Sequence, residues 1–576
     1  MMKTVTTFVS GLLLSAVLLL PASARAAELQ PFFTLKLSGV NTLVSAAEKI
    51  GTMAGFADRA EFREVITTAK GMKGFNPNEI VGVAAVVVGD EIQPILLLPI
   101  TDLWGAEIPG YSDVFDTIRP FLSKKGEGKF AISSPFGTYI AVQKKDYLVI
   151  TLDTIADQVP ADPKKLFADL DKYTLGFKLD LEKVDFDLIE ANIFGPLMMF
   201  MYMQNPEAAE QFENIIEVYR QLNKEFSIVT GGLAFDPKTA NSELSGTAVP
   251  RKGSDYAKML AGYKKQPTVF GGFRGTPENV ILSFGDSATQ QSPLPNQDAL
   301  MEPARKQWET LLSGFMEQIE AEDEDGEISK MAKIAIDSLQ KIIETETKRG
   351  ASDSALSLNT EGTLLFAFDT ASLAEIQKLA AMAVDFAAQR MGSVAADFDI
   401  DFKAAVKRDY VTIEGFKVSS FLFPMDKVVS LAPDPNAAEM LKGVSPGVFW
   451  AVKDVSGKQA IAVAAGLDSA KTESAFKAAL EKTKTPVPVQ KPIGIVSVQG
   501  LGNFLQQTVY PIAAKADAPN LAEAKKVFDI LAAAGNEATV TLNTEIKPDQ
   551  VEVGYHISGK AIQAIISAVK VAVEGL

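Results

Sequence analysis

The sequence predicts an α+β fold built from repeated strand-helix-helix-strand-strand-helix segments, with mostly antiparallel sheets and helices packed on one face. Three observations lead to this prediction. Apolar residues alternate with the period of a strand in many short runs, they follow the helical period in others, and tight turns join successive strands as hairpins. At 576 residues the chain is too long for one small core, so we expect two or more compact bodies.

The clearest segment is the last one, at about residues 492–573. It holds a strand, two helices, a hairpin that turns at Lys547-Pro548-Asp549, and a final helix that begins at Ser558. Asn520 and Glu523 are spaced as a capping box for the second of the paired helices. The apolar stripe of the final helix consists of Ile562, Ile565, Ile566, Val569 and Val573.

The same order of elements can be read in three earlier segments, at about residues 31–103, 173–263 and 278–392. Residue identities differ between the segments, so this prediction rests on the pattern of elements. We expect two α+β halves, 27–265 and 266–576, each with two segments joined by connecting hairpins. Strands are expected at Phe33–Leu37, Thr174–Leu179, Phe226–Phe235, Asn241–Val249, Ala538–Ile546 and Val551–Ile557.

Residues 1–26 are typical of a secretory signal peptide. Lys3 supplies a positive charge, an apolar stretch runs from about Phe8 to Leu20, and small residues suited to cleavage follow Pro21. We therefore expect an exported protein, periplasmic or extracellular, with no integral membrane span after the signal is removed.

Several classes of chemistry lack the residues that they need. The chain has no cysteine, which excludes disulfides and thiolate metal sites, and its one histidine, His556, is too few for a serine triad or a histidine metal pair. The carboxylates at 320–327 do not follow the spacing of a calcium loop, and a solvated turn is the better interpretation. Gly271-Gly272-Phe273-Arg274-Gly275 matches no phosphate-binding motif. We expect no cofactor, no metal site and no catalytic residue.

The net charge of −16 argues against binding to nucleic acid, because an acidic body repels a phosphate backbone. One stretch favours binding of another kind. It is apolar on all sides and rich in methionine, which suits adaptable apolar contacts. It is either a central core helix or the wall of a lipophilic site or partner surface. The candidate ligand-binding residues are Phe194, Leu197, Met198, Met199, Phe200, Met201 and Met203.

These observations predict an exported, non-catalytic cell-envelope protein that binds a lipophilic ligand between sheet and helices. Two alternatives stay open. The chain could be a structural or protein-interaction component of the envelope, with an envelope protein as its partner, or an enzyme of a type that the sequence does not reveal. An apolar cavity beside residues 194–203 would favour the lipophilic ligand.

Overall fold

The structure of the protein is a computed structural model. It describes residues 29–109, 122–126, 128–134, 137–195, 198, 216, 217, 219, 220, 222–276, 278–290, 327–349, 351–382, 405–431, 441–455, 458–515 and 520–574. The predicted signal peptide lies outside these residues. As the sequence predicts, the fold is mixed α+β and its named strands pair antiparallel. The chain divides into two compact units, Met1–Ala257 with Asp549–Gly559, and Lys258–Pro548 with Lys560–Leu576.

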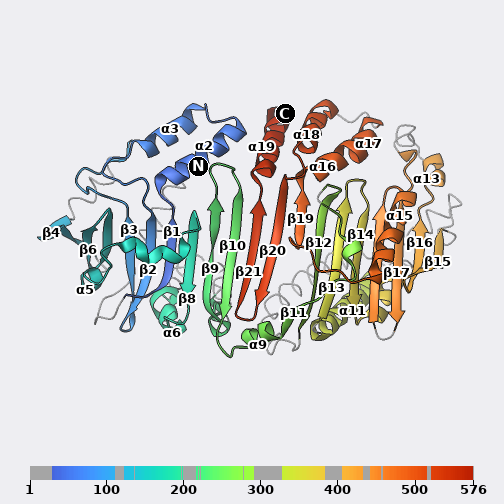
Figure 1. The fold of residues 1–576 in the computed structure, drawn as a ribbon, viewed down its shortest axis with the longest axis horizontal. Coiled ribbons are helices and arrows are strands. Elements are labelled where there is room, and N and C mark those ends of the chain that lie inside the picture. Colours follow the sequence, from blue (N-terminus) through green and yellow to red (C-terminus); the bar gives the residue numbers. More distant parts are fainter. Residues whose placement is uncertain are drawn as a thin grey trace. The chain divides into compact units, whose positions relative to one another are not determined.

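The first unit contains an antiparallel sheet whose strands lie in the order β4-β5-β6-β7-β3-β2-β1-β8-β9-β10-β21 (Figure 1). Its strands are β1 (Pro31–Leu37), β2 (Val81–Val88), β3 (Glu91–Leu98), β4 (Leu122–Gly126), β5 (Lys129–Ser134), β6 (Gly137–Lys144), β7 (Tyr147–Leu152), β8 (Leu175–Asp180), β9 (Phe226–Phe235), β10 (Ser242–Pro250) and β21 (Gln550–Ile557). Its helical elements are α2 (Val40–Ala54), α3 (Ala60–Lys70), α5 (Asp153–Ala156), η2 (Pro163–Leu170), α6 (Phe186–Ile189) and the π-helical turn η3 (Glu190–Phe194). Helix α9 (Asp255–Gly262) follows β10.

The main core of the first unit lies between one face of this sheet and η2. Phe167 of η2 is buried against strand residues such as Ile95, Leu97 and Val149. Gly82 makes this packing possible, because a Cβ at that position would lie 2.5 Å from the Phe167 ring. This approach is closer than van der Waals contact allows, so η2 sits where β2 has no side chain.

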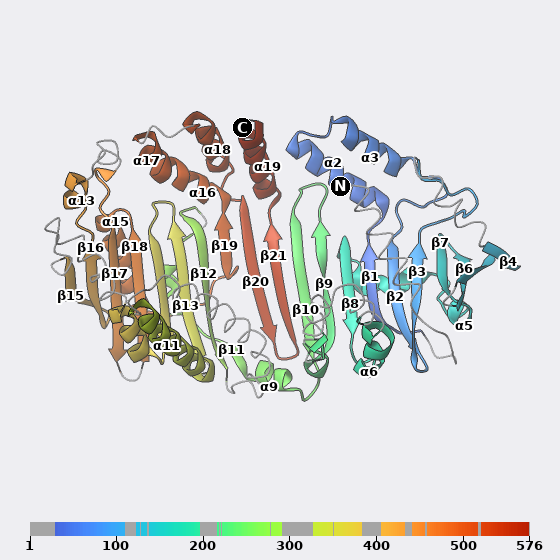
Figure 2. The same ribbon diagram turned by 180° about the vertical axis from the view of Figure 1, so that it is seen from behind.

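Within the second unit the strands pair antiparallel in the order β20-β19-β12-β13-β14-β18-β17-β16-β15, with β11 on the far end of β12 (Figure 2). Its strands are β11 (Tyr263–Lys265), β12 (Val280–Gln290), β13 (Ala351–Asn359), β14 (Leu364–Thr370), β15 (Val406–Ile413), β16 (Phe416–Leu422), β17 (Gly447–Val455), β18 (Lys458–Gly466), β19 (Gly494–Ser497) and β20 (Thr539–Lys547). Its helical elements are η4 (Gly271–Phe273), α11 (Glu327–Arg349), α13 (Met425–Leu431), α15 (Ser469–Glu481), η5 (Lys482–Lys484), α16 (Val498–Phe504), η6 (Leu505–Val509), α17 (Tyr510–Lys515), α18 (Leu521–Ala532) and α19 (Gly559–Glu574).

Helix α15 and the turn η4 cover one face of the second sheet. Small strand residues such as Ala367 and Ala462 leave room for Phe270, Phe273 and Phe476, and each of these three rings is 0% exposed. Because they are fully buried, these rings form the centre of the second core. Figures 1 and 2 show α15 and α11 on opposite faces of this sheet.

The outer strands β4 and β15 carry features that discourage pairing with another chain. Lys124 and Lys125 lie on β4, and Lys407 and Arg408 lie on β15, where the pairing register shifts between Lys407 and Val411. Charges and irregular pairing at an edge oppose intermolecular strand addition. Among the described helices, none is long and apolar enough to cross a membrane.

Candidate functional site

Strand β1 buries the polar side chains of Thr34 and Lys36, whereas Phe33, Leu35 and Leu37 between and beside them are only half-buried. Thr34 and Lys36 are 5% and 4% exposed. The Lys36 ammonium donates to the Leu170 carbonyl of η2 over 2.8 Å, and burial lowers its pKa despite the neighbouring Asp171. An amphipathic strand normally turns its apolar side inward, so this arrangement calls for an explanation.

The apolar side of β1 continues across four more strands of the first unit. Paired residues place side chains in rows across β1, β8, β9, β10 and β21, and we call these three rows the open face. The first row is Leu37, Leu175, Leu233, Leu244 and Tyr555. The second row is Leu35, Phe177, Gly231, Gly246 and Val553. The third row is Phe33, Leu179, Val229, Ala248 and Val551.

The first row of the open face is strongly exposed. Leu175, Leu233, Leu244 and Tyr555 expose 44%, 39%, 55% and 45% of their surface. Scattered exposed apolar residues are ordinary, but adjacent ones on four neighbouring strands form a continuous apolar patch. No charged or amide side chain interrupts the three rows, and the Tyr555 hydroxyl is their one polar side-chain group.

The centre of the open face has a shallow depression. Gly231 and Gly246 are directly paired on β9 and β10. The Phe177 ring lies beside Gly231, since a Cβ there would be 3.0 Å from the ring. A Cβ at Gly246 would meet only the Thr230 carbonyl oxygen, at 3.4 Å. The space above Gly246 is therefore unfilled, between the larger side chains of the neighbouring rows.

The end of the open face at its third row is closed by α6 and η3. Leu188, Ile189 and Phe194 share a hydrophobic cluster with Phe33 and Leu179. The face is thus covered at one end by helical residues and exposed at the other, in the first row.

Two of the seven predicted ligand-binding residues lie within the described residues. Phe194 is half-buried, with its ring centroid 6.1 Å from Phe186 and 5.9 Å from Tyr219, and Met198 is also half-buried. The structure thus places Phe194 beside the open face. The other five, Leu197, Met199, Phe200, Met201 and Met203, lie outside the described residues.

The sequence predicts the strands of the open face but does not predict that its residues form a site. Alternation along each strand predicts an apolar side but does not say whether that side is covered. One signal was available, because two glycines of this face, Gly231 and Gly246, lie inside neighbouring strands. Glycine inside a strand often marks close approach of a ligand or of another backbone.

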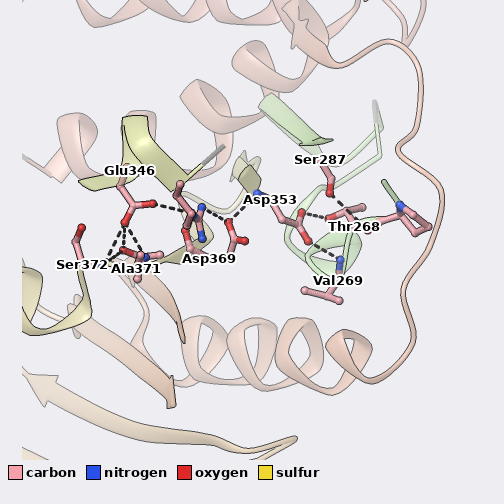
Figure 3. Close-up of polar contacts among 11 residues, drawn as sticks. Thr268, Val269, Ser287, Glu346, Asp353, Asp369, Ala371 and Ser372 are labelled. Atoms are coloured by element: carbon pink, nitrogen blue, oxygen red, sulfur yellow. Dashed lines mark hydrogen bonds and ion pairs between the residues drawn. The ribbon is translucent and has the colours of Figure 1, made fainter. Parts of the chain in front are cut away.

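A polar cluster in the second unit is an alternative candidate site, because it holds three carboxylates (Figure 3). Asp353 on β13 accepts hydrogen bonds from the Thr268 hydroxyl at 2.6 Å and the Val269 N–H at 2.9 Å. Its own N–H donates to Asp369 over 2.7 Å. Burial raises the pKa of Asp353 and outweighs the two hydrogen bonds that it accepts.

The rest of this cluster joins the end of α11 to β14. Arg349 pairs with Asp369 at 2.9 Å and with Glu346 at 3.0 Å. Burial acts to raise the pKa of Glu346, but hydrogen bonds from Thr370 and the Ala371 N–H, with the Arg349 charge, bring it below its ordinary value. Each carboxylate is engaged by protein donors, so the cluster fastens elements together and is a poor candidate for chemistry on a substrate.

Comparison with known proteins does not assign the chain to a family. No family model matches it, and neither the curated proteins nor the solved structures contain a significant match. Among the described residues, no group of histidine and acidic side chains is arranged to hold a metal ion.

Proposed function

We propose that the protein is an exported, non-catalytic cell-envelope protein that binds a lipophilic molecule on the open face of its first unit. The observation that carries this proposal is the exposed apolar first row, in a sheet that buries Lys36 on its other side. Leaving these apolar side chains in water is unfavourable, and covering them with a hydrocarbon group removes that penalty.

The chemistry of the face favours hydrocarbon over an extended peptide. Strands β8, β9 and β10 are each paired on both sides, so their main chains offer no edge for strand addition. An extended peptide lying on the face would bring N–H and C=O groups that the face cannot satisfy. A hydrocarbon chain has no such groups, and the Tyr555 hydroxyl at one corner is placed for a polar head group.

The size of the face also suits a small ligand. Strands about 4.8 Å apart and same-face residues about 6.8 Å apart give the first two rows an area on the order of 300 Å². A stable protein interface needs about 800 Å² from each partner, which is well above this area. At about 25 cal/mol per Å², covering the face contributes roughly 7 kcal/mol before the cost of association, and the buried surface of the ligand adds to it.

Replacing Leu244 by aspartate is expected to weaken binding of a lipophilic probe to the open face. Leu244 is 55% exposed, so the fold should tolerate the change, but any ligand would have to desolvate the new carboxylate. We expect the affinity of delipidated protein for a pyrene-labelled fatty acid to fall at least tenfold, equivalent to about 1.4 kcal/mol. Saturation titration by fluorescence measures this change.

Ser245→Asp is the matched control, because it places the same charge one residue away on the opposite face of β10. It should leave the affinity unchanged. Equal losses in the two variants, or saturable binding that neither variant alters, would exclude the open face. Absence of saturable binding to the wild-type protein would contradict the proposed function itself.

We also infer that the predicted segments are repeats with an internal two-fold relation in each unit. Two similar arrangements support this inference. The first strands of the segments at 31–103 and 173–263 pair with each other, as β1 with β8. Likewise β12 and β19, the first strands of the segments at 278–392 and 492–573, pair with each other. In both units the next strand of each segment pairs with the outer side of that segment's first strand, as β2 with β1, β9 with β8, β13 with β12 and β20 with β19.

A further inference from the structure

The second unit contains an apolar recess of about 350 Å³ at the ends of β14, β16, β17 and β18. No charged residue lines it. Its lining residues are Gly362, Phe421, Phe423, Pro446, Gly447, Val448, Ala465, Gly466 and Leu467. We call it the Val448 recess. Val448 and Leu467 are 39% and 40% exposed, so part of its apolar lining faces solvent.

The Val448 recess is one end of an apolar row that crosses the second sheet. Phe421, Val448 and Ala465 are paired with one another on β16, β17 and β18. The row continues through residues of the neighbouring strands, which are Leu364, Leu358, Leu282, Val496 and Val540. This row faces away from the core that contains Phe476, because strand residues alternate between the two faces.

We propose that the Val448 recess is a second binding site, separate from the open face, for the hydrocarbon chain of a single small amphiphile. The recess has the volume of a small-molecule site, at the lower end of the usual range of about 300–1,000 Å³. Because its lining is apolar, it is suited to a chain that carries no hydrogen-bonding groups. The polar head of the amphiphile would remain in solvent at the mouth.

Three other occupants fit the recess less well. Strands β16, β17 and β18 are each paired on both sides, so an added peptide strand has no main-chain partner and would bury unsatisfied polar groups. A helix is about 10–12 Å across with its side chains, which is too wide for this volume. A second copy of the chain would need about 20–30 residues a side, far more than line the recess.

Trp450 provides a local reporter for this site. It lies two residues beyond Val448 on β17 and on the same face of the sheet. The chain has three tryptophans, and Trp104→Phe with Trp308→Phe leaves Trp450 alone. A brominated alcohol, ω-bromododecanol, quenches a tryptophan only at short range. We expect saturable quenching of Trp450 by this probe, and competition by unbrominated dodecanol.

Val448→Asp and Leu467→Asp should each lower the affinity of the probe, measured by the quenching of Trp450, at least tenfold. Val569→Asp, on an exposed side of α19, is the matched control and should leave it unchanged. Leu244→Asp in the first unit should also leave it unchanged, which separates this site from the open face. Quenching that does not saturate, or that persists in both recess variants, would overturn the proposal. Loss of Trp450 quenching in Leu244→Asp would overturn the independence of the two sites.

Discussion

Replacing Gly502 by alanine is expected to destabilise the second unit by about 3 kcal/mol, the upper end of the usual effect of overpacking. Gly502 lies in α16, and a Cβ there would be 2.1 Å from the Ala532 N atom and 2.4 Å from the Leu531 carbonyl carbon of α18. These are backbone atoms, so the clash cannot be relieved by a change of rotamer. The two helices would have to move apart.

The expected loss of stability is opposite in sign to the usual effect of this substitution. In the interior of a helix, alanine is normally more stable than glycine by about 1 kcal/mol. Asn503→Ala, at the next position, is the control and should change the stability by no more than about 0.5 kcal/mol. Urea unfolding followed by Trp450 fluorescence, in the protein with Trp450 as its one tryptophan, reports on the second unit. Equal or greater stability of Gly502→Ala would show that α16 and α18 are not in such close contact.

The hairpin strands were predictable because the period of two is local information. The expected strands 33–37, 226–235 and 551–557 lie within β1, β9 and β21, which span Pro31–Leu37, Phe226–Phe235 and Gln550–Ile557. Glycine and Asp-Pro turns between apolar runs fix where each strand ends. The α+β class and the antiparallel pairing follow from these hairpins.

Burial was less predictable, because it depends on what lies opposite in space. The expected apolar stripe of the last helix is largely exposed, with Ile565, Val569 and Val573 at 44%, 55% and 66%, whereas Ala561 and Ala568 are buried. The small residues allow close approach of a neighbour, and this cannot be read from helical periodicity. The open face shows the same effect in a sheet, because the covered side of β1 is the one with Thr34 and Lys36.

Helix α16 shows another limit of prediction from the sequence. It begins at Val498 and includes Gly500 and Gly502, where local propensity favours a loop. A Cβ at Gly500 would lie 2.0 Å from the Val280 carbonyl oxygen. The helix therefore depends on tertiary packing for its stability, and single-sequence reasoning does not include that packing.

Replacing Asp353 by alanine is expected to destabilise the second unit by about 3 kcal/mol, because the Thr268 hydroxyl and the Val269 N–H lose their buried acceptor. Thr268 and Val269 lead directly into Phe270 and Phe273, whose rings are 0% exposed in the core. Undocking this segment would expose both rings. Urea unfolding and increased binding of a hydrophobic dye measure the two consequences, and unchanged stability would contradict this role of Asp353.

Asp353→Asn tests the charge apart from the hydrogen bonds. The asparagine oxygen still accepts one hydrogen bond, so the loss should be smaller than for alanine. Burial raises the pKa of Asp353 above its ordinary value of 3.8, with the charges of Asp369 and Asp286 acting in the same direction. The folded state thus binds this proton more tightly than the unfolded state does. The resulting stability is present below the ordinary pKa and is lost as the pH rises through the folded value. Asp353→Asn removes this titration, so its stability relative to wild type should improve as the pH rises through that window. A difference between the two proteins that does not vary with pH would show that Asp353 does not titrate with a raised pKa.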